Sequence, residues 1–163
     1  LLFVLSGVLS PRELYDGVDW PVIVLLGAMI PVGGALEATG MTQLIAEGIL
    51  TGAAGIPVYL VLGFILVVTM TLSDIMNNAA TAVVMAPIGV AVANGLDASS
   101  DAFLMAVAIG ASSAFLTPIG HQNNALVMGP GGYRFGDYWR VGLPLEVIIV
   151  VVAVPLLAWF WPL

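Results

Sequence analysis

Two stretches of the sequence place polar side chains inside otherwise apolar surroundings. The first, "SDIMNNAAT", covers residues 73–81, and the second, "TPIGHQNN", covers residues 117–124. A polar side chain that is buried in hydrocarbon costs several kcal/mol unless a partner satisfies it. Amide and hydroxyl oxygens can coordinate a cation, and amide NH₂ groups can donate hydrogen bonds to an anion. These two stretches are therefore the candidate site for small ions.

The composition indicates an integral membrane protein. Of the 163 residues, 61% are hydrophobic and only 8% are charged, and the mean hydropathy is +1.12. An ordinary soluble domain has roughly 25% charged residues, and so few charges could not cover this much apolar surface in water. The net charge of −7 comes from dispersed acids, and the basic patch that nucleic acid requires is missing from the sequence. The sequence has no cysteine, which excludes disulfides and thiolate metal sites.

The lengths of the apolar segments predict an all-α transmembrane helix bundle. A hydrocarbon core of about 30 Å needs roughly 20 apolar residues in a helix, and Asp19 and Pro21 suit the start of one such helix. The chain opens within an apolar run without an initiator Met, so we expect residues 1–163 to be the C-terminal part of a longer chain. The predicted segments are the end of a truncated span at 1–9, a span at 20–37 that breaks or kinks at Pro31, an interfacial helix at 43–50, two arms over 57–95, a discontinuous span at 102–128 and a last span at 141–161.

The charged residues predict the orientation in the membrane. The three cations, Arg12, Arg134 and Arg140, fall in predicted loops on one side. The charged residues in the predicted loops on the opposite side are all acidic. Because cytoplasmic loops are enriched in Lys and Arg, we expect a multi-pass protein of the cell membrane with its C-terminus outside.

The two polar stretches also interrupt the predicted helices. Pro118 and Gly120 prevent a continuous helix through the second stretch. Paired discontinuous elements are typical of secondary transporters, which bind substrate and coupling ion near the bilayer midplane. For the first stretch the residues leave two alternatives open. Segment 57–95 is either a re-entrant hairpin with its tip at Asn77 and Asn78, or two full spans joined by a surface turn, because each arm is nearly long enough to cross.

Three longer motifs carry a resemblance to a known family. They are "VDWPVIVLLGAMIPVGGALEATG", "SDIMNNAATAVVMAPI" and "ASSAFLTPIGHQNNALVMGPGGYRFGDYWRVGLPL". Over nearly its whole length the chain resembles the C-terminal half of the divalent anion/sodium symporter family (solute carrier family 13-type permeases of the ion transporter superfamily). The resemblance implies half of an inverted-repeat transporter with one re-entrant helical hairpin and one unwound, discontinuous helix. It also implies an N-terminal half as partner, a surrounding bilayer and a homodimer.

The resemblance further implies a sodium site. In the family, the coupling ion Na⁺ is held by a serine before the hairpin signature, by a tip carbonyl, by the signature Asn and by a carbonyl of the unwound helix. The matching positions in this sequence are Ser73, Met76 (through its backbone), Asn78 and Gly120.

The positions that match the substrate site depart from the family pattern. The family's Ser-Asn-Thr falls on Asn77, Asn78 and Ala79, and only the central Asn is kept. Thr81 is a candidate replacement for the missing hydroxyl. The family's Thr-Pro-Pro after the unwound-helix carbonyl falls on the three residues His121, Gln122 and Asn123. These departures favour a small inorganic anion such as sulfate slightly over a di- or tricarboxylate.

The function expected from these features is secondary-active, sodium-coupled anion symport, and not enzymatic catalysis. Within transport, the alternatives are a sodium/proton antiporter that uses Asp74 and an arsenite-type carrier of the same superfamily. An intramembrane enzyme using Asp74 and His121 is disfavoured, because the sequence has one His, no Cys and no H-E-x-x-H motif. A purely structural membrane domain is the remaining alternative. We interpret Asp74 as a cap or a solvated acid in the access cavity, and Glu146 as a structural residue within reach of Arg140 or the interface.

Overall fold

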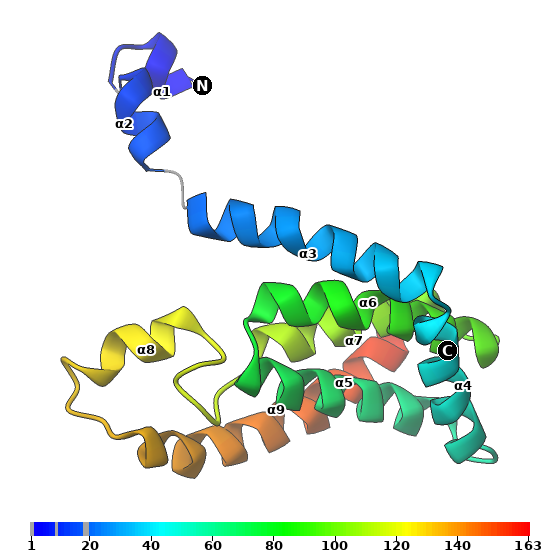
Figure 1. Ribbon diagram of the computed structural model, residues 1–163. Coiled ribbons are helices and arrows are strands. Elements are labelled where there is room, and N and C mark those ends of the chain that lie inside the picture. The colour runs from blue at the N-terminus through cyan, green and yellow to red at the C-terminus, as the bar shows by residue number, and fades with distance from the viewer. Residues whose placement is uncertain (1, 9, 18–19) are drawn as a thin grey trace.

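The computed structural model describes residues 2–8, 10–17 and 20–163, and within these ranges the regular elements are helices, without a strand. Figure 1 shows a helical bundle from which the N-terminal elements project. The helices are α1 (Leu2–Leu5), α2 (Pro11–Asp16), α3 (Trp20–Ala38), α4 (Met41–Gly52), α5 (Val58–Ile75), α6 (Asn78–Gly95), α7 (Ser100–Ser112), α8 (Gln122–Met128), the 3₁₀ turn η1 (Phe135–Asp137) and α9 (Tyr138–Phe160).

Helices α5, α6 and α7 form the centre of the bundle, and each packs on the other two. The packing is close where side chains are small. A Cβ atom added at Gly110 of α7 would lie 2.8 Å from the Leu66 carbonyl oxygen of α5, so glycine is required at this crossing. The core around the crossing is apolar, because the fully buried side chains include Leu62, Ile65 and Phe103.

The remaining helices cover this centre. Helix α9 packs against α5 and α7, α4 packs against α6, and α3 packs against both α4 and α6. In Figure 1 the α5–α6 turn, the segment after α7 and the start of α9 gather at the same end of the bundle. Helix α8 (yellow) lies beyond that end, and the C-terminus lies at the other.

Three of these helical stretches are long and apolar enough to cross a membrane: Val58–Ile75, Asn78–Gly95 and Phe135–Phe160. The predicted all-α membrane bundle is therefore confirmed at this level. Helix α9 has an outward apolar face with exposed Val147, Ile148 and Val151. This face suits contact with lipid, because exposing apolar surface to water is unfavourable.

The structure differs from the sequence prediction in the first third of the chain. Helix α3 is continuous through Pro31, so the predicted break is not observed, while a kink at this proline stays a prediction. Gly33 instead serves packing, because a Cβ at this position would lie 3.2 Å from a Val83 side-chain carbon of α6. Within the predicted span end at 1–9, the described helix covers only Leu2–Leu5. The predicted N-cap Asp19 lies outside the described residues.

Candidate ion and substrate site

The α5–α6 turn is short and is closed by amide side chains. Helix α5 ends at Ile75, Met76 and Asn77 are extended, and Asn77 is the N-cap of α6. The Oδ1 atoms of Asn77 and Asn78 both accept a hydrogen bond from the Ala79 amide, at 2.9 and 2.8 Å. Side-chain oxygens in this position satisfy the free N–H groups at a helix start, which explains why amides are placed at the turn.

Residues 113–121 connect α7 to α8 without helical structure. Pro118 lies in the middle of this connecting segment and cannot donate a backbone hydrogen bond. Asn124 of α8 donates from Nδ2 to the carbonyl oxygens of Ala114 and Thr117, at 3.1 and 3.2 Å. The Tyr138 hydroxyl of α9 in turn donates to the Asn124 carbonyl oxygen at 2.6 Å. The connecting segment is therefore held in a defined shape by α8 and α9.

The end of α5 and the connecting segment are in direct contact. Thr117 Oγ1 donates to the Asp74 carbonyl oxygen at 2.6 Å, and just before the segment Ser73 Oγ donates to the carbonyl oxygen of Ala111 in α7 at 2.7 Å. A Cβ at Gly120 would lie 2.6 Å from the Ser73 carbonyl oxygen. Only glycine allows such a close approach, so the sequence is adapted to bring the two polar stretches together.

Two buried acids also bind the connecting segment. Asp74 and Glu146 have 3% and 8% of their surface exposed. Asp74 Oδ1 accepts a hydrogen bond from the Leu116 amide, and Glu146 Oε1 accepts one from the Phe115 amide, both at 2.9 Å. The two carboxyl groups thus bind successive peptide groups, and Asp74 Oδ2 is buried without a hydrogen-bond partner among the described residues. The interpretation of Asp74 as a solvated acid is therefore wrong, because its carboxyl group is buried and binds the backbone.

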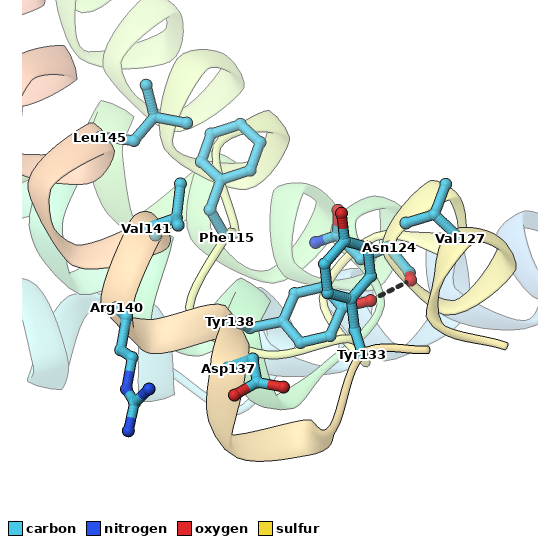
Figure 2. A pocket seen from close by; sticks show the side chains of 10 residues that line it. Phe115, Asn124, Val127, Tyr133, Asp137, Tyr138, Arg140, Val141 and Leu145 are labelled. Atoms are coloured by element: carbon cyan, nitrogen blue, oxygen red, sulfur yellow. Dashed lines mark hydrogen bonds between the residues drawn. The ribbon is translucent and has the colours of Figure 1, made fainter. Parts of the chain in front are cut away.

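A pocket of about 470 Å³ adjoins the connecting segment, between α8, the loop after it and the start of α9. Figure 2 shows Phe115, Val141 and Leu145 on its apolar side and Tyr133, Tyr138 and Asn124 on its polar side. The dashed line in Figure 2 is the Tyr138–Asn124 hydrogen bond. Arg140 extends away from the other labelled side chains. The residues that the sequence predicts for anion binding do not line this pocket.

The predicted sodium ligands are partly brought together. Ser73 is fully buried, and its backbone lies against Gly120. Met76 is 36% exposed at the C-terminal cap of α5, and Asn78 opens α6. Within the described part of the chain, no hydrogen bond joins Met76 or Asn78 to the connecting segment, and the Ser73 hydroxyl donates to the Ala111 carbonyl oxygen.

The predicted substrate residues lie at two helix starts. Asn77, Asn78, Ala79 and Thr81 form the first turn of α6, and Thr81 is buried there. His121 is the N-cap of α8, where Nδ1 accepts from the Asn123 amide at 3.3 Å. Gln122 is the first residue of α8, and its side chain is outside the described part of the structure. Helix starts present N–H groups toward negative charge, which suits an anion.

Sequence reasoning missed two residues that shape the site, Glu146 and Asn124. Glu146 was expected near Arg140 or the interface, but its carboxyl group holds the Phe115 amide. A signal for this role exists, since Glu146 is the only charged residue in the apolar stretch 141–161, and acids within membrane spans usually face a partner or a site. Asn124 belongs to the second polar stretch. Its hydrogen bonds to the carbonyl oxygens of Ala114 and Thr117 form only because the connecting segment folds back against α8.

An all-helical bundle with membrane-length helices and polar helix ends gathered at one place is an arrangement expected of a membrane transport protein. The chain belongs to the citrate transporter family (CitMHS), whose match covers residues 1–163. This family membership agrees with the resemblance to divalent anion/sodium symporters. The family and the three relatives described next are named as transporters and not as enzymes.

Three relatives illustrate the similarity. The chain is 41% identical over 157 residues to "Uncharacterized transporter sll0640" of Synechocystis sp., covering 96% of this chain and 26% of the relative. It is 36% identical over 154 residues to "Uncharacterized transporter YfbS" of Escherichia coli, covering 94% and 25%. It is 28% identical over 160 residues to "Sodium/sulfate cotransporter 2" of Chlamydomonas reinhardtii, covering 93% and 17%. The chain thus spans about a quarter of the length of the first two relatives.

Proposed function

We propose that the chain is the C-terminal half of a sodium-coupled anion symporter. Sodium and the anion bind where the α5–α6 turn meets the connecting segment 113–121. The observation that carries the proposal is the close approach of Gly120 to the Ser73 carbonyl oxygen, since it joins two sequence stretches that the resemblance implies in sodium binding. The names of two relatives, sodium/sulfate cotransporters 1 and 2 of Chlamydomonas reinhardtii, support the same coupling ion.

In this proposal the sodium ligands are Ser73, the Met76 backbone, Asn78 and Gly120. Carbonyl and amide oxygens suit a hard monovalent cation. The anion is bound by the starts of α6 and α8, through Asn77, Asn78, Thr81 and the polar residues 121–123, with Ala79 leaving space. The N–H groups at these starts and the Asn NH₂ groups supply donors without adding a fixed positive charge.

The proposal includes a membrane arrangement. Helices α5 and α6 form a re-entrant hairpin with its tip at Asn77, and α7 and α8 are the two parts of one discontinuous span. An inverted-repeat N-terminal half supplies the other side of the site, and the complete transporter is a homodimer in the cell membrane. The C-terminus lies outside, so a cysteine at Ala98 is labelled from outside and one at Phe135 only after permeabilisation. Labelling of both from the same side would contradict the orientation.

Uptake by the full-length transporter in liposomes tests the function. Radiolabelled sulfate, succinate and citrate are offered separately under an inward sodium gradient, with potassium replacing sodium as the control. The proposal expects uptake of at least one of these anions that depends on the sodium gradient, with sulfate the first candidate. Uptake that is driven equally well by a proton gradient without sodium would contradict sodium coupling and favour a proton-linked carrier.

A further inference from the structure

Glu146 holds the connecting segment from a helix that contributes none of the proposed ligands. Its Oε1 atom accepts a hydrogen bond from the Phe115 amide at 2.9 Å. The next amide along the chain, that of Leu116, is held by Asp74 at the same distance. Two successive peptide groups are thus fixed by carboxyl groups from two different helices, α9 and α5.

The backbone of α9 reaches the same peptide groups. A Cβ at Gly142 would lie 2.2 Å from the Phe115 carbonyl oxygen and 3.0 Å from the Leu116 amide nitrogen. Gly142 precedes Glu146 by one helical turn, so both residues lie on the face of α9 that meets the segment. Both are buried. Phe115 is therefore held at its N–H group by Glu146 and is in contact at its carbonyl group with the α9 backbone.

These contacts lie immediately before the part of the segment that meets α5. Leu116 is followed by Thr117, whose hydroxyl donates to the Asp74 carbonyl oxygen. Three residues further on, Gly120 meets the Ser73 carbonyl oxygen. A change in the direction of the Phe115 and Leu116 peptide groups would therefore move the carbonyl groups that follow.

We propose that Glu146 is a positioning residue, which fixes the connecting segment through the Phe115 amide and so sets the geometry of the ion site at Gly120 and Ser73. This inference rests on the proposed function and adds to it a residue of α9. The role requires an acceptor oxygen, and not a negative charge. A glutamine at position 146 would keep the acceptor, and its NH₂ group could donate to the partnerless Asp74 Oδ2.

The test compares four forms of the full-length transporter: wild type, Glu146→Ala, Glu146→Gln and Val147→Ala. Val147 is the neighbour of Glu146 on α9 but is 54% exposed, so its variant controls for general changes to the helix. Two quantities are measured on folded, purified protein. They are hydrogen exchange of peptides that cover residues 113–121, and the apparent sodium affinity of anion uptake in liposomes.

We expect Glu146→Ala to speed exchange in residues 113–121 and to weaken the apparent sodium affinity at least about fivefold, since the partly buried Phe115 amide loses its hydrogen-bond partner. Glu146→Gln and Val147→Ala should remain within about threefold of wild type. A merely structural role would lower the yield of folded protein and leave the sodium affinity of the folded fraction unchanged, which would overturn the inference. Equal weakening by Glu146→Gln and Glu146→Ala would overturn it as well, because the charge would then matter.

Failure of the proposed function gives a different result. Wild-type uptake without sodium dependence would contradict sodium coupling, while the exchange measurement still reports on Glu146. In that case the apparent affinity for the anion replaces the sodium affinity as the second quantity. Unchanged exchange in Glu146→Ala would overturn the positioning role whatever the coupling ion.

Discussion

Gly120 lies against the backbone of Ser73 so closely that a methyl group on Gly120 would come within 2.6 Å of the Ser73 carbonyl oxygen. The two residues are 47 positions apart in the sequence and belong to the two polar stretches that interrupt its apolar pattern. Their contact joins α5 to the connecting segment, and the hydrogen bond from the Thr117 hydroxyl to the Asp74 carbonyl oxygen reinforces it.

Gly120→Ala should separate the two polar stretches. The new methyl group would also lie 2.5 Å from the Ala114 side chain, so the segment must shift. We expect a loss of stability of about 1–3 kcal/mol and a strong loss of sodium-dependent uptake per folded transporter. The matched control is Gly129→Ala, because nothing lies within 4 Å of a Cβ at that position. Wild-type uptake by Gly120→Ala would contradict the importance of this contact.

Asn124 should be needed for the shape of the connecting segment. Asn124→Ala removes donors to two carbonyl oxygens, and we expect a stability loss of about 1–3 kcal/mol. Asn124→Asp should be at least as harmful, because a carboxylate has no N–H to donate and repels both carbonyl oxygens. Thermal unfolding of the purified full-length protein measures both. Stability equal to wild type in Asn124→Asp would show that these hydrogen bonds do not hold the segment.

The α5–α6 turn should behave as a hairpin tip inside the protein. Single cysteines at Met76 and Ala79 are expected to react with small aqueous reagents, and sodium or the anion should slow both reactions. The rate of labelling in intact vesicles, with and without ligand, is the measurement. Rapid labelling from the cytoplasm by bulky reagents, at a rate that ligands do not change, would indicate a surface turn.

The helices of this chain are largely predictable from its sequence, because membrane spans are read from long apolar runs. Helices α5 and α6 lie close to the predicted segment 57–95, and α9 lies close to the predicted last span at 141–161. Pro31 does not end α3, since proline is tolerated inside membrane helices when neighbouring groups satisfy the freed carbonyl. The adjacent Gly33 is explained by packing on α6, which no local pattern reveals.

The candidate site was predictable in its residue types but not in its internal contacts. The adjacent asparagines at 77–78 indicate a polar turn between α5 and α6. The helix-breaking Pro118 and Gly120, followed by amide residues, indicate that the connecting segment is irregular and polar. The pairing of Asp74 with Leu116, and of Glu146 with Phe115, joins residues 42 and 31 positions apart. Such contacts follow from how α5, α7 and α9 pack, and a single sequence carries no periodic signal for them.

The most direct test of the account concerns Asn78, the one signature residue that this sequence retains. Its amide can offer an oxygen to sodium and an NH₂ group to the anion. The apparent affinities for sodium and for the transported anion should be measured in liposomes for full-length wild type, Asn78→Ala and Asn78→Asp, with Asn77→Ser as the control that keeps a helix cap.

We expect Asn78→Ala to weaken both affinities by about 5- to 150-fold, which corresponds to roughly 1–3 kcal/mol for each lost partner. Asn78→Asp should retain or tighten sodium binding and weaken anion binding sharply, because it keeps an acceptor, loses the donor and adds a negative charge. Asn77→Ser should change both affinities far less than Asn78→Asp does, because Ser keeps a hydrogen-bonding oxygen at the helix cap. If Asn78→Ala folds and transports with both affinities unchanged, the turn between α5 and α6 is not the binding site.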